Sequence, residues 1–149
     1  NEVLKLKETL NREKDKKDIK LILDYLNNIN LNSLALAYVG DASYELYIRK
    51  YLVSKGNYKV NDLQKSAVNY VSAKAQSNFL DNLIKDDFLN TEELEIVKRA
   101  RNHKVLSHPK NTSIVVYKKA TGLEALIGYL ELTNNEKRIK QIMKNIVGD

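Results

Sequence analysis

The chain has 149 residues, a net charge of +6 and no cysteine. This length suits one domain that buries roughly 70% of its unfolded surface, and the absence of cysteine excludes disulfides and thiolate metal sites. No apolar run reaches the ~18 residues of a membrane span and the charged N-terminus lacks a signal-peptide core, so we expect a soluble, cytoplasmic protein with no membrane contact.

The N-terminal part is highly charged. Residues 1–20 carry seven Lys or Arg and five Asp or Glu with few apolar side chains, which predicts an exposed or frayed helix. From Asp18 the apolar residues become dense enough for a short buried helix, closed by an asparagine-rich turn at 27–30. We therefore predict a charged N-terminal extension at 1–17 and a single folded domain at 18–149.

Hydrophobic periodicity predicts helices for the rest of the chain. The run at 34–52 forms one helix, and a long helix begins at Asn61 or Asp62 and extends to Leu83. Thr91 is followed by two glutamates and starts a helix that ends with basic residues.

Two further helices follow a loop that holds the only proline. One begins at Thr112 or Ser113 and carries Glu124, and the last, which is amphipathic, begins at Asn134 or Asn135. We therefore predict an all-α fold of six or seven helices.

Two acids interrupt runs of apolar and small residues. Asp41 lies in LALAYVGDASYELYIRKYL at 34–52, and Glu124 lies in ATGLEALIGYLEL at 120–132. A buried ionised carboxylate costs several kcal/mol unless it is paired, hydrogen-bonded or bound to a cation. A cap or a lysine pair would explain either acid alone. However, the glycines and alanines beside both acids let the two helices approach closely, and two carboxylates on rigid helices suit Mg²⁺ and phosphodiester hydrolysis.

Positive charge is concentrated in one segment. No Asp or Glu occurs between Ile96 and Leu123, and without the seven cations of that segment the rest of the chain has a net charge of −1. A solvated basic face is the simple explanation, but the nearby loop and two arginines favour a surface that binds phosphate groups. The residues predicted to bind phosphate, and so nucleic acid, are Lys98, Arg99, Arg101, Asn102, Lys104, Lys110, Lys118 and Lys119.

Both acid-containing runs resemble motifs of the ribonuclease III family. The first is similar to its signature ERLEFLGDAVL and the second to ADxFEALIGAIYLD. When the runs are aligned on Gly40-Asp41 and on Glu124 to Gly128, the metal-site aspartate of the family falls on Asp41 and its catalytic glutamate on Glu124.

The chain also departs from the family pattern. Leu34 and Ala37 stand where glutamates usually precede the aspartate, and Thr121 stands where an aspartate precedes the glutamate. Because the sequence ends soon after the second motif, we expect no double-stranded-RNA-binding domain of the usual kind. These reductions, together with VSAKAQ, RARN, PKN and EALIGYL, resemble the Mini-ribonuclease III subgroup.

This resemblance implies a homodimeric, Mg²⁺-dependent endoribonuclease that cleaves double-stranded RNA and matures the ends of 23S ribosomal RNA. A ribosomal protein or the assembling large subunit would be a further partner. In this interpretation Thr121 orients a metal-bound water, and Tyr38 contacts the partner subunit, with core packing as its alternative. Glu45 is either an accessory acid or an ion-pair partner of Arg49, and we predict the ion pair.

Two other classes of protein stay open from the sequence. A catalytically inactive ribonuclease-III-like module that binds structured RNA is compatible with the missing acids. A basic helical protein-interaction domain is the other alternative, and in that case Asp41 and Glu124 should lie far apart.

Overall fold

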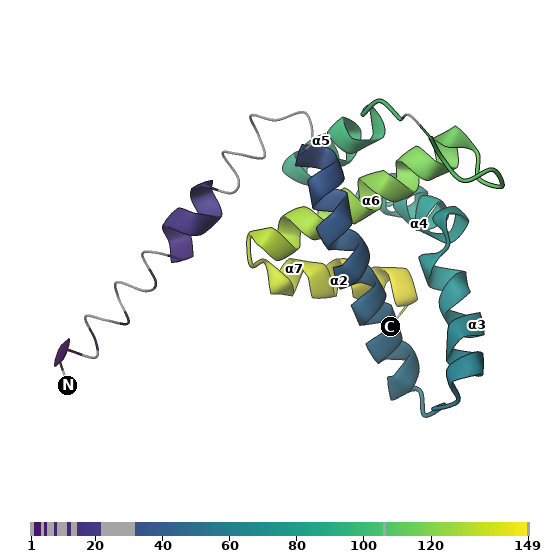
Figure 1. The fold of residues 1–149 in the computed structure, drawn as a ribbon, viewed down its shortest axis with the longest axis horizontal. Helices are drawn as coiled ribbons and strands as arrows, with labels where there is room; N and C mark the ends of the chain where they lie inside the picture. Colours follow the sequence, from purple (N-terminus) through teal and green to yellow (C-terminus); the bar gives the residue numbers. More distant parts are fainter. Residues whose placement is uncertain are drawn as a thin grey trace. The chain divides into compact units, whose positions relative to one another are not determined.

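Every regular element in the described part of the chain is a helix, which confirms the all-α prediction. The computed structural model describes residues 2, 3, 5, 8, 12, 15–21, 32–105 and 107–148. Residues 15–21 are helical. The helices that follow are α2 (Asn32–Ser54), α3 (Val60–Val71), α4 (Ala73–Lys85), α5 (Thr91–Arg101), α6 (Ile114–Leu132) and α7 (Glu136–Val147) (Figure 1).

The chain divides into two compact units, Asn1–Asn32 and Ser33–Asp149. In the first unit Leu21, which was predicted to lie in a buried helix, is 65% exposed. The rest of that predicted helix and the turn at 27–30 lie outside the described residues, and the boundary at 17/18 stays a prediction. Within the described ranges, no helix combines the length and apolarity that a membrane crossing requires.

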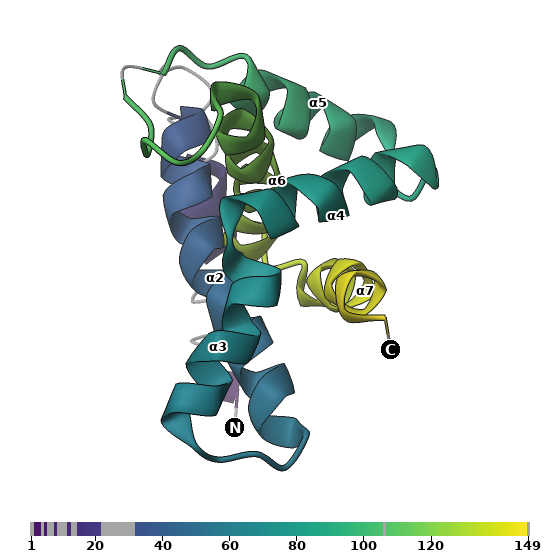
Figure 2. The ribbon, with the colours of Figure 1, turned by 90° about the vertical axis from the view of Figure 1, so that its right-hand side faces the viewer.

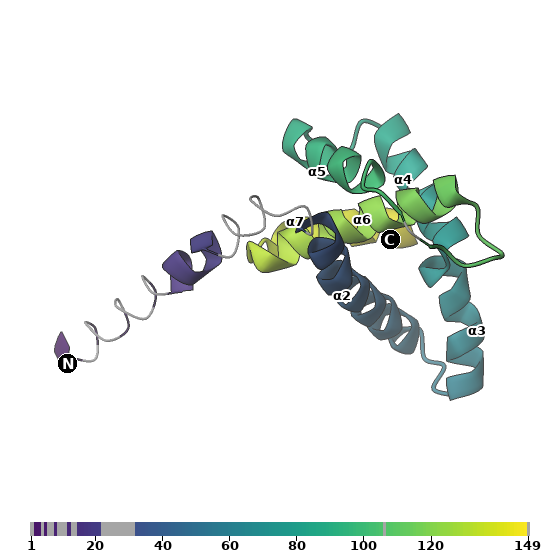
Figure 3. The same cartoon turned by 45° about the horizontal axis from the view of Figure 1, so that its top comes forward.

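Helix α6 is the element around which the second unit packs. It contacts α4, α5 and α7, and it crosses α2 at close range. Figures 2 and 3 show α2 on one side of α6, with α4 and α5 on the other. A helix that is apolar on all sides is stable only when it is surrounded. Eight residues of α6 are buried: Ala120, Gly122, Leu123, Ala125, Leu126, Ile127, Gly128 and Leu130.

The predicted long helix from Asn61 or Asp62 to Leu83 is wrong, because Ser72 divides it into α3 and α4. Ser72 has an extended backbone (φ −63°, ψ 152°), and its hydroxyl accepts a hydrogen bond from the Ala75 N–H, which caps α4. Helix α3 buries none of its residues, and Val68 is 57% exposed. Only the C-terminal end of the apolar face of α3 reaches the core, where the partly buried Tyr70 and Val71 pack against it.

A buried ion pair joins α7 to the start of α5. Asn90 and Glu93 form a capping box at the N-terminus of α5. The Glu93 carboxylate accepts hydrogen bonds of 2.8 Å from Arg138 Nε and Nη2, and Arg138 also donates to the Phe88 carbonyl oxygen and lies over the Phe88 ring. The Glu93 side chain is only 3% exposed, so this contact fixes α7 against the α4–α5 turn.

Replacing Arg138 by methionine is expected to lower the free energy of unfolding by about 3 kcal/mol, because it leaves the Glu93 charge buried without a partner. The matched control is Arg49→Met, which removes an exposed pair with Glu45 and is expected to cost less than about 1 kcal/mol. Urea unfolding of the two variants measures the difference, and equal losses would contradict the structural role of Arg138.

The same pair predicts a dependence of stability on pH. Burial alone would raise the pKa of Glu93, but the hydrogen bonds from Arg138 and from the Asn90 backbone outweigh it and hold the pKa below its ordinary value of 4.5. The contribution of Glu93 is therefore present above that value and is lost as the pH falls through the lowered pKa. The stability gap between the wild type and Glu93→Gln should accordingly shrink in urea unfolding between neutral pH and about pH 3.

Candidate active site

Two glycines bring the backbones of α2 and α6 into direct contact. A methyl group at Gly40 would lie 1.6 Å from the backbone oxygen of Glu124, and one at Gly128 would lie 1.8 Å from the backbone oxygen of Leu36. No side chain fits between the helices at these points. The small residues beside both acids therefore allow the close approach of the two helices that the sequence predicted. Asp41 follows directly after Gly40, one of the two contact points.

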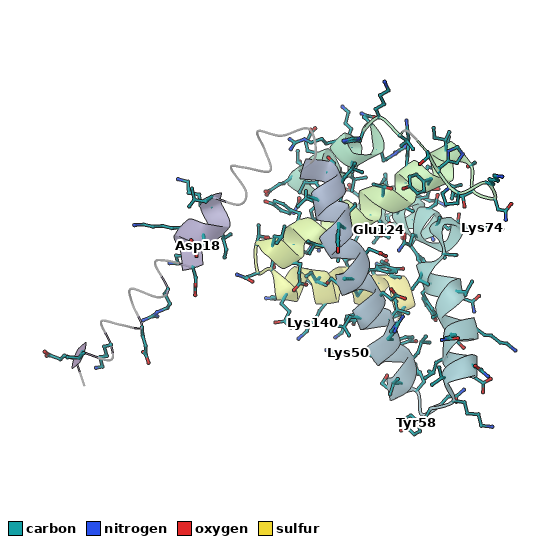
Figure 4. The ribbon with its side chains drawn as sticks, in the orientation of Figure 1. Asp18, Lys50, Tyr58, Lys74, Glu124 and Lys140 are labelled. Atoms are coloured by element: carbon teal, nitrogen blue, oxygen red, sulfur yellow. The ribbon has the colours of Figure 1, made fainter. Side chains whose placement is uncertain are left out.

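The carboxyl groups of Asp41 and Glu124 meet at this crossing. Asp41 is exposed and Glu124 is half-buried, and Figure 4 labels Glu124 on α6 where α2 passes over it. Burial raises the pKa of Glu124 to about 8, with a hydrogen bond to Asp41 and the Asp41 charge as further causes. Without a cation Glu124 is therefore expected to be mostly protonated at neutral pH. The structure thus brings together the two acids that the sequence singled out. If the chain were only a protein-interaction domain, these acids were predicted to lie far apart.

The neighbouring residues Glu45 and Thr121 have defined partners. Arg49 Nη2 donates to Glu45 Oε1 at 2.9 Å, so the predicted ion pair is confirmed. The Thr121 hydroxyl lies one turn before Glu124 and donates to the Tyr117 carbonyl oxygen at 3.0 Å. That bond occupies its proton and leaves its lone pairs to accept a hydrogen bond from water.

The donor set at the crossing suits a hard divalent cation. No cluster of three or more His, Asp or Glu occurs within the described ranges, so Asp41 and Glu124 are the acids available here. Mg²⁺ is commonly bound through one or two carboxylates, with waters and substrate phosphates completing its octahedral shell. A cation at this position would also replace the proton on Glu124, so the residues fit a magnesium ion.

The predicted basic segment covers the end of α5, the loop that follows and the start of α6 (Figure 1). Most of its predicted RNA-binding side chains reach the surface: Lys98, Arg99, Asn102, Lys104 and Lys110 are exposed, and Arg101, Lys118 and Lys119 are half-buried.

Two residues of this segment connect it to other elements. Lys119 Nζ lies 3.1 Å from Asp81 on α4, so its charge is partly neutralised by an acid outside the segment. Arg101 Cγ would be 3.1 Å from a methyl group at Gly122. The aliphatic stem of Arg101 therefore packs against α6 two residues before Glu124.

Tyr38 is 73% exposed on α2. Core packing, the alternative for this residue, is therefore wrong for the described chain. Leu34, one turn earlier, is also exposed, so α2 presents an apolar surface beside Asp41. A contact between subunits through Tyr38 stays a prediction.

Sequence reasoning missed Tyr44. Its side chain is fully buried, and its hydroxyl donates to the Tyr70 carbonyl oxygen at 2.6 Å. Burial, followed by the charges of Glu124 and Tyr70, raises the pKa of Tyr44. The available signal was a tyrosine one turn after Gly40, on the face of α2 that packs against α6.

Comparison with known proteins agrees with this geometry. The protein-family model of the ribonuclease III domain matches residues 34–135 of this chain. Over 113 residues the chain is 48% identical to a protein called Mini-ribonuclease 3 from Enterococcus faecalis, covering 76% of this chain and 86% of that protein. A protein of the same name from Clostridium tetani is 46% identical over 118 residues, which is 78% of this chain and 77% of that one.

A solved structure has the same fold. The X-ray crystal structure of protein FN1578 from Fusobacterium nucleatum superposes with a TM-score of 0.71 at 38% sequence identity. The match covers 80% of this chain and 95% of that one.

Proposed function

Because the chain is an endoribonuclease of the Mini-ribonuclease 3 group in the ribonuclease III family, we propose that it cleaves double-stranded RNA with the help of Mg²⁺. In this proposal Asp41 and Glu124 form the active site. We further propose that its substrate is the precursor of 23S ribosomal RNA, whose ends it matures. The observation that carries the proposal is the meeting of these two carboxyl groups at the glycine contact between α2 and α6.

In this proposal Asp41 and Glu124 would hold Mg²⁺, directly or through water. When bound, the ion would lower the pKa of a coordinated water and neutralise charge on the scissile phosphate. The half-buried position of Glu124 excludes competing solvent on one side, and the exposed position of Asp41 leaves the other side open to a phosphodiester. The Thr121 hydroxyl, whose proton is given to Tyr117, would accept a hydrogen bond from water and so orient it.

The basic segment would bind the RNA backbone. The major groove of an A-form duplex is too narrow for side chains to read, so recognition should depend mainly on shape and on phosphate contacts. The exposed cations Lys98, Arg99, Lys104 and Lys110 suit this role. Lys118 and Arg101 would add contacts nearer α6, Asn102 would donate hydrogen bonds, and Lys119 would contribute less because of its bond to Asp81.

We also propose that the enzyme acts in the cytoplasm as a homodimer, with residues 18–149 as the catalytic domain. The exposed apolar positions Leu34 and Tyr38 beside Asp41 support a contact between subunits there. Two active sites would suit cleavage of both strands of a duplex. A ribosomal protein or the assembling large subunit is a further proposed partner. Sedimentation that detects only monomer at micromolar concentration would contradict the dimer.

The function is tested by incubating the protein with a duplex from the 23S ribosomal RNA precursor. We expect specific cleavage with Mg²⁺ and none after chelation, because the ion would supply both the activated water and the positive charge beside the phosphate. Binding without cleavage would instead support the inactive RNA-binding module, and cleavage that is unchanged after chelation would contradict the metal site.

Replacing Arg99 and Arg101 by glutamine is expected to weaken RNA binding and to reduce the log–log salt slope by about one unit for each lost phosphate contact, by analogy with duplex DNA. Glutamine keeps the aliphatic stem that packs Arg101 against Gly122. The matched control removes two exposed charges elsewhere, at Lys65 on α3 and Lys137 on α7. Binding titrations at several salt concentrations measure the slope, and equal slopes for both double variants would contradict the proposed surface.

A further inference from the structure

Tyr44 makes an unusual contact for a core residue. Its side chain has no exposed surface, yet its hydroxyl is polar and must find a partner when buried. That partner is the backbone carbonyl of Tyr70, 2.6 Å away and 26 residues later in the chain. The tyrosine therefore ties α2 to the end of α3.

The contact occurs where the predicted long helix breaks. Tyr70 lies in the last turn of α3, whose carbonyls have no partner within the helix. Ser72 follows with an extended backbone and caps α4. The Tyr44 hydroxyl thus satisfies a carbonyl at the α3–α4 corner and fastens this corner to α2, in the region where Figure 2 shows the three helices together.

The same side chain borders the acid pair. Tyr44 lies one turn after Gly40, whose backbone touches that of Glu124. In agreement with this position, the Glu124 charge contributes to the raised pKa of Tyr44. A tyrosine hydroxyl has one proton, and that proton is given to Tyr70. Tyr44 therefore cannot donate to Glu124, which keeps its carboxylate oxygens for Asp41 or for a cation.

We propose that Tyr44 is a positioning residue for the acid pair. Its bond to the Tyr70 carbonyl fixes the ring one turn from the Gly40–Glu124 backbone contact, and the fixed ring would hold the Glu124 carboxyl group toward Asp41. The catalytic part of this inference rests on the proposed function, whereas the anchoring of the ring rests on the hydrogen bond alone. Tyr44 acts through Glu124 and touches neither RNA nor metal.

The test compares Tyr44→Phe with Tyr129→Phe. Each variant loses one tyrosine hydroxyl that bonds across helices, since the Tyr129 hydroxyl donates to Glu92 on α5. The readouts are the Tm without metal, the rise in Tm on adding Mg²⁺, the Kd for duplex RNA in Ca²⁺, and the single-turnover cleavage rate at saturating RNA and Mg²⁺. The rise in Tm reports metal binding independently of cleavage.

Both variants are expected to have a lower Tm than the wild type, because both lose a hydrogen bond between helices. Only Tyr44→Phe should lose at least half of the Mg²⁺-induced rise in Tm and cleave about 10- to 100-fold more slowly, the range seen when outer-shell partners of metal ligands are removed. RNA binding should be unchanged in both. Tyr129→Phe should keep the wild-type response to Mg²⁺ and the wild-type cleavage rate.

Tyr44→Phe that keeps the wild-type Mg²⁺ response and cleavage rate overturns the positioning role while leaving the proposed function intact. A wild-type protein whose Tm does not respond to Mg²⁺ contradicts the metal site itself, and the positioning role with it. If Tyr44→Phe does not fold in buffer alone, the same comparison is made in a stabilising osmolyte such as sucrose, which favours the folded state. A reduced Mg²⁺ response of Tyr44→Phe under these conditions supports the role, and a wild-type response overturns it.

Discussion

Replacing Glu124 by glutamine is expected to reduce the single-turnover cleavage rate by at least about 100-fold while duplex RNA still binds. Glutamine keeps the shape of the side chain but removes the charge that would hold Mg²⁺. The fold should survive, because burial and Asp41 already raise the pKa of Glu124 to about 8, so the neutral side chain resembles the form present at neutral pH without metal. Cleavage under single-turnover conditions and binding in Ca²⁺ measure the two properties separately.

Glu45→Gln is the matched control. It removes the same charge one turn beyond Asp41, but there the carboxylate is exposed and paired with Arg49, so cleavage should stay near the wild-type rate. If Glu124→Gln cleaves as fast as the wild type, the proposed active site is wrong. If both variants lose cleavage equally, the loss comes from removing any negative charge near Asp41 and is not specific to Glu124.

Replacing Gly128 or Gly40 by alanine is expected to destabilise the fold by about 3 kcal/mol or more. The added methyl groups would overlap the backbone oxygens of Leu36 and Glu124, at 1.8 and 1.6 Å. These atoms belong to packed helices and cannot move aside as the end of a flexible side chain can. The helices would have to separate, which would also pull Asp41 away from Glu124.

Gly122→Ala is the control, because it makes the same change on the same helix. Its methyl group would meet the Arg101 and Val97 side chains at 3.1 and 3.2 Å and the Val97 backbone oxygen at 3.3 Å. Shifts of a few tenths of an ångström relieve these contacts, and the higher helix propensity of alanine should keep the cost below about 1 kcal/mol. Urea unfolding and Tm measure all three variants. A Gly128→Ala protein as stable as Gly122→Ala would contradict the direct backbone contact.

The sequence predicted the tertiary structure best where the residues that form a local pattern also make the contact between helices. Gly40 and Gly128 indicated a close approach of two helices, and an acid beside each contact followed from the same runs. The division at Ser72 was missed because the residues around it also suit a continuous helix, and the cap becomes decisive only when the two halves pack differently.

Periodicity and charge patterns did not predict side-chain contacts between residues that lie far apart in the sequence. An amphipathic pattern shows that α3 has an apolar face, but it does not show whether anything covers that face. The pairing of Lys119 with Asp81 joins residues 38 positions apart, so the absence of acids from a segment did not guarantee that its lysines were unpaired. The link between Tyr44 and Tyr70 depends in the same way on the final packing.

The contact at Gly40 and Gly128 separates two properties that an enzyme engineer would want to vary independently. Main-chain atoms set the distance between the helices that carry Asp41 and Glu124, so no rotamer choice at the protein surface alters it. Exposed side chains of the loop after α5 can then be exchanged without moving the two carboxyl groups. The RNA binding that we propose for this loop could therefore be strengthened or weakened while the geometry of the acid pair stays the same.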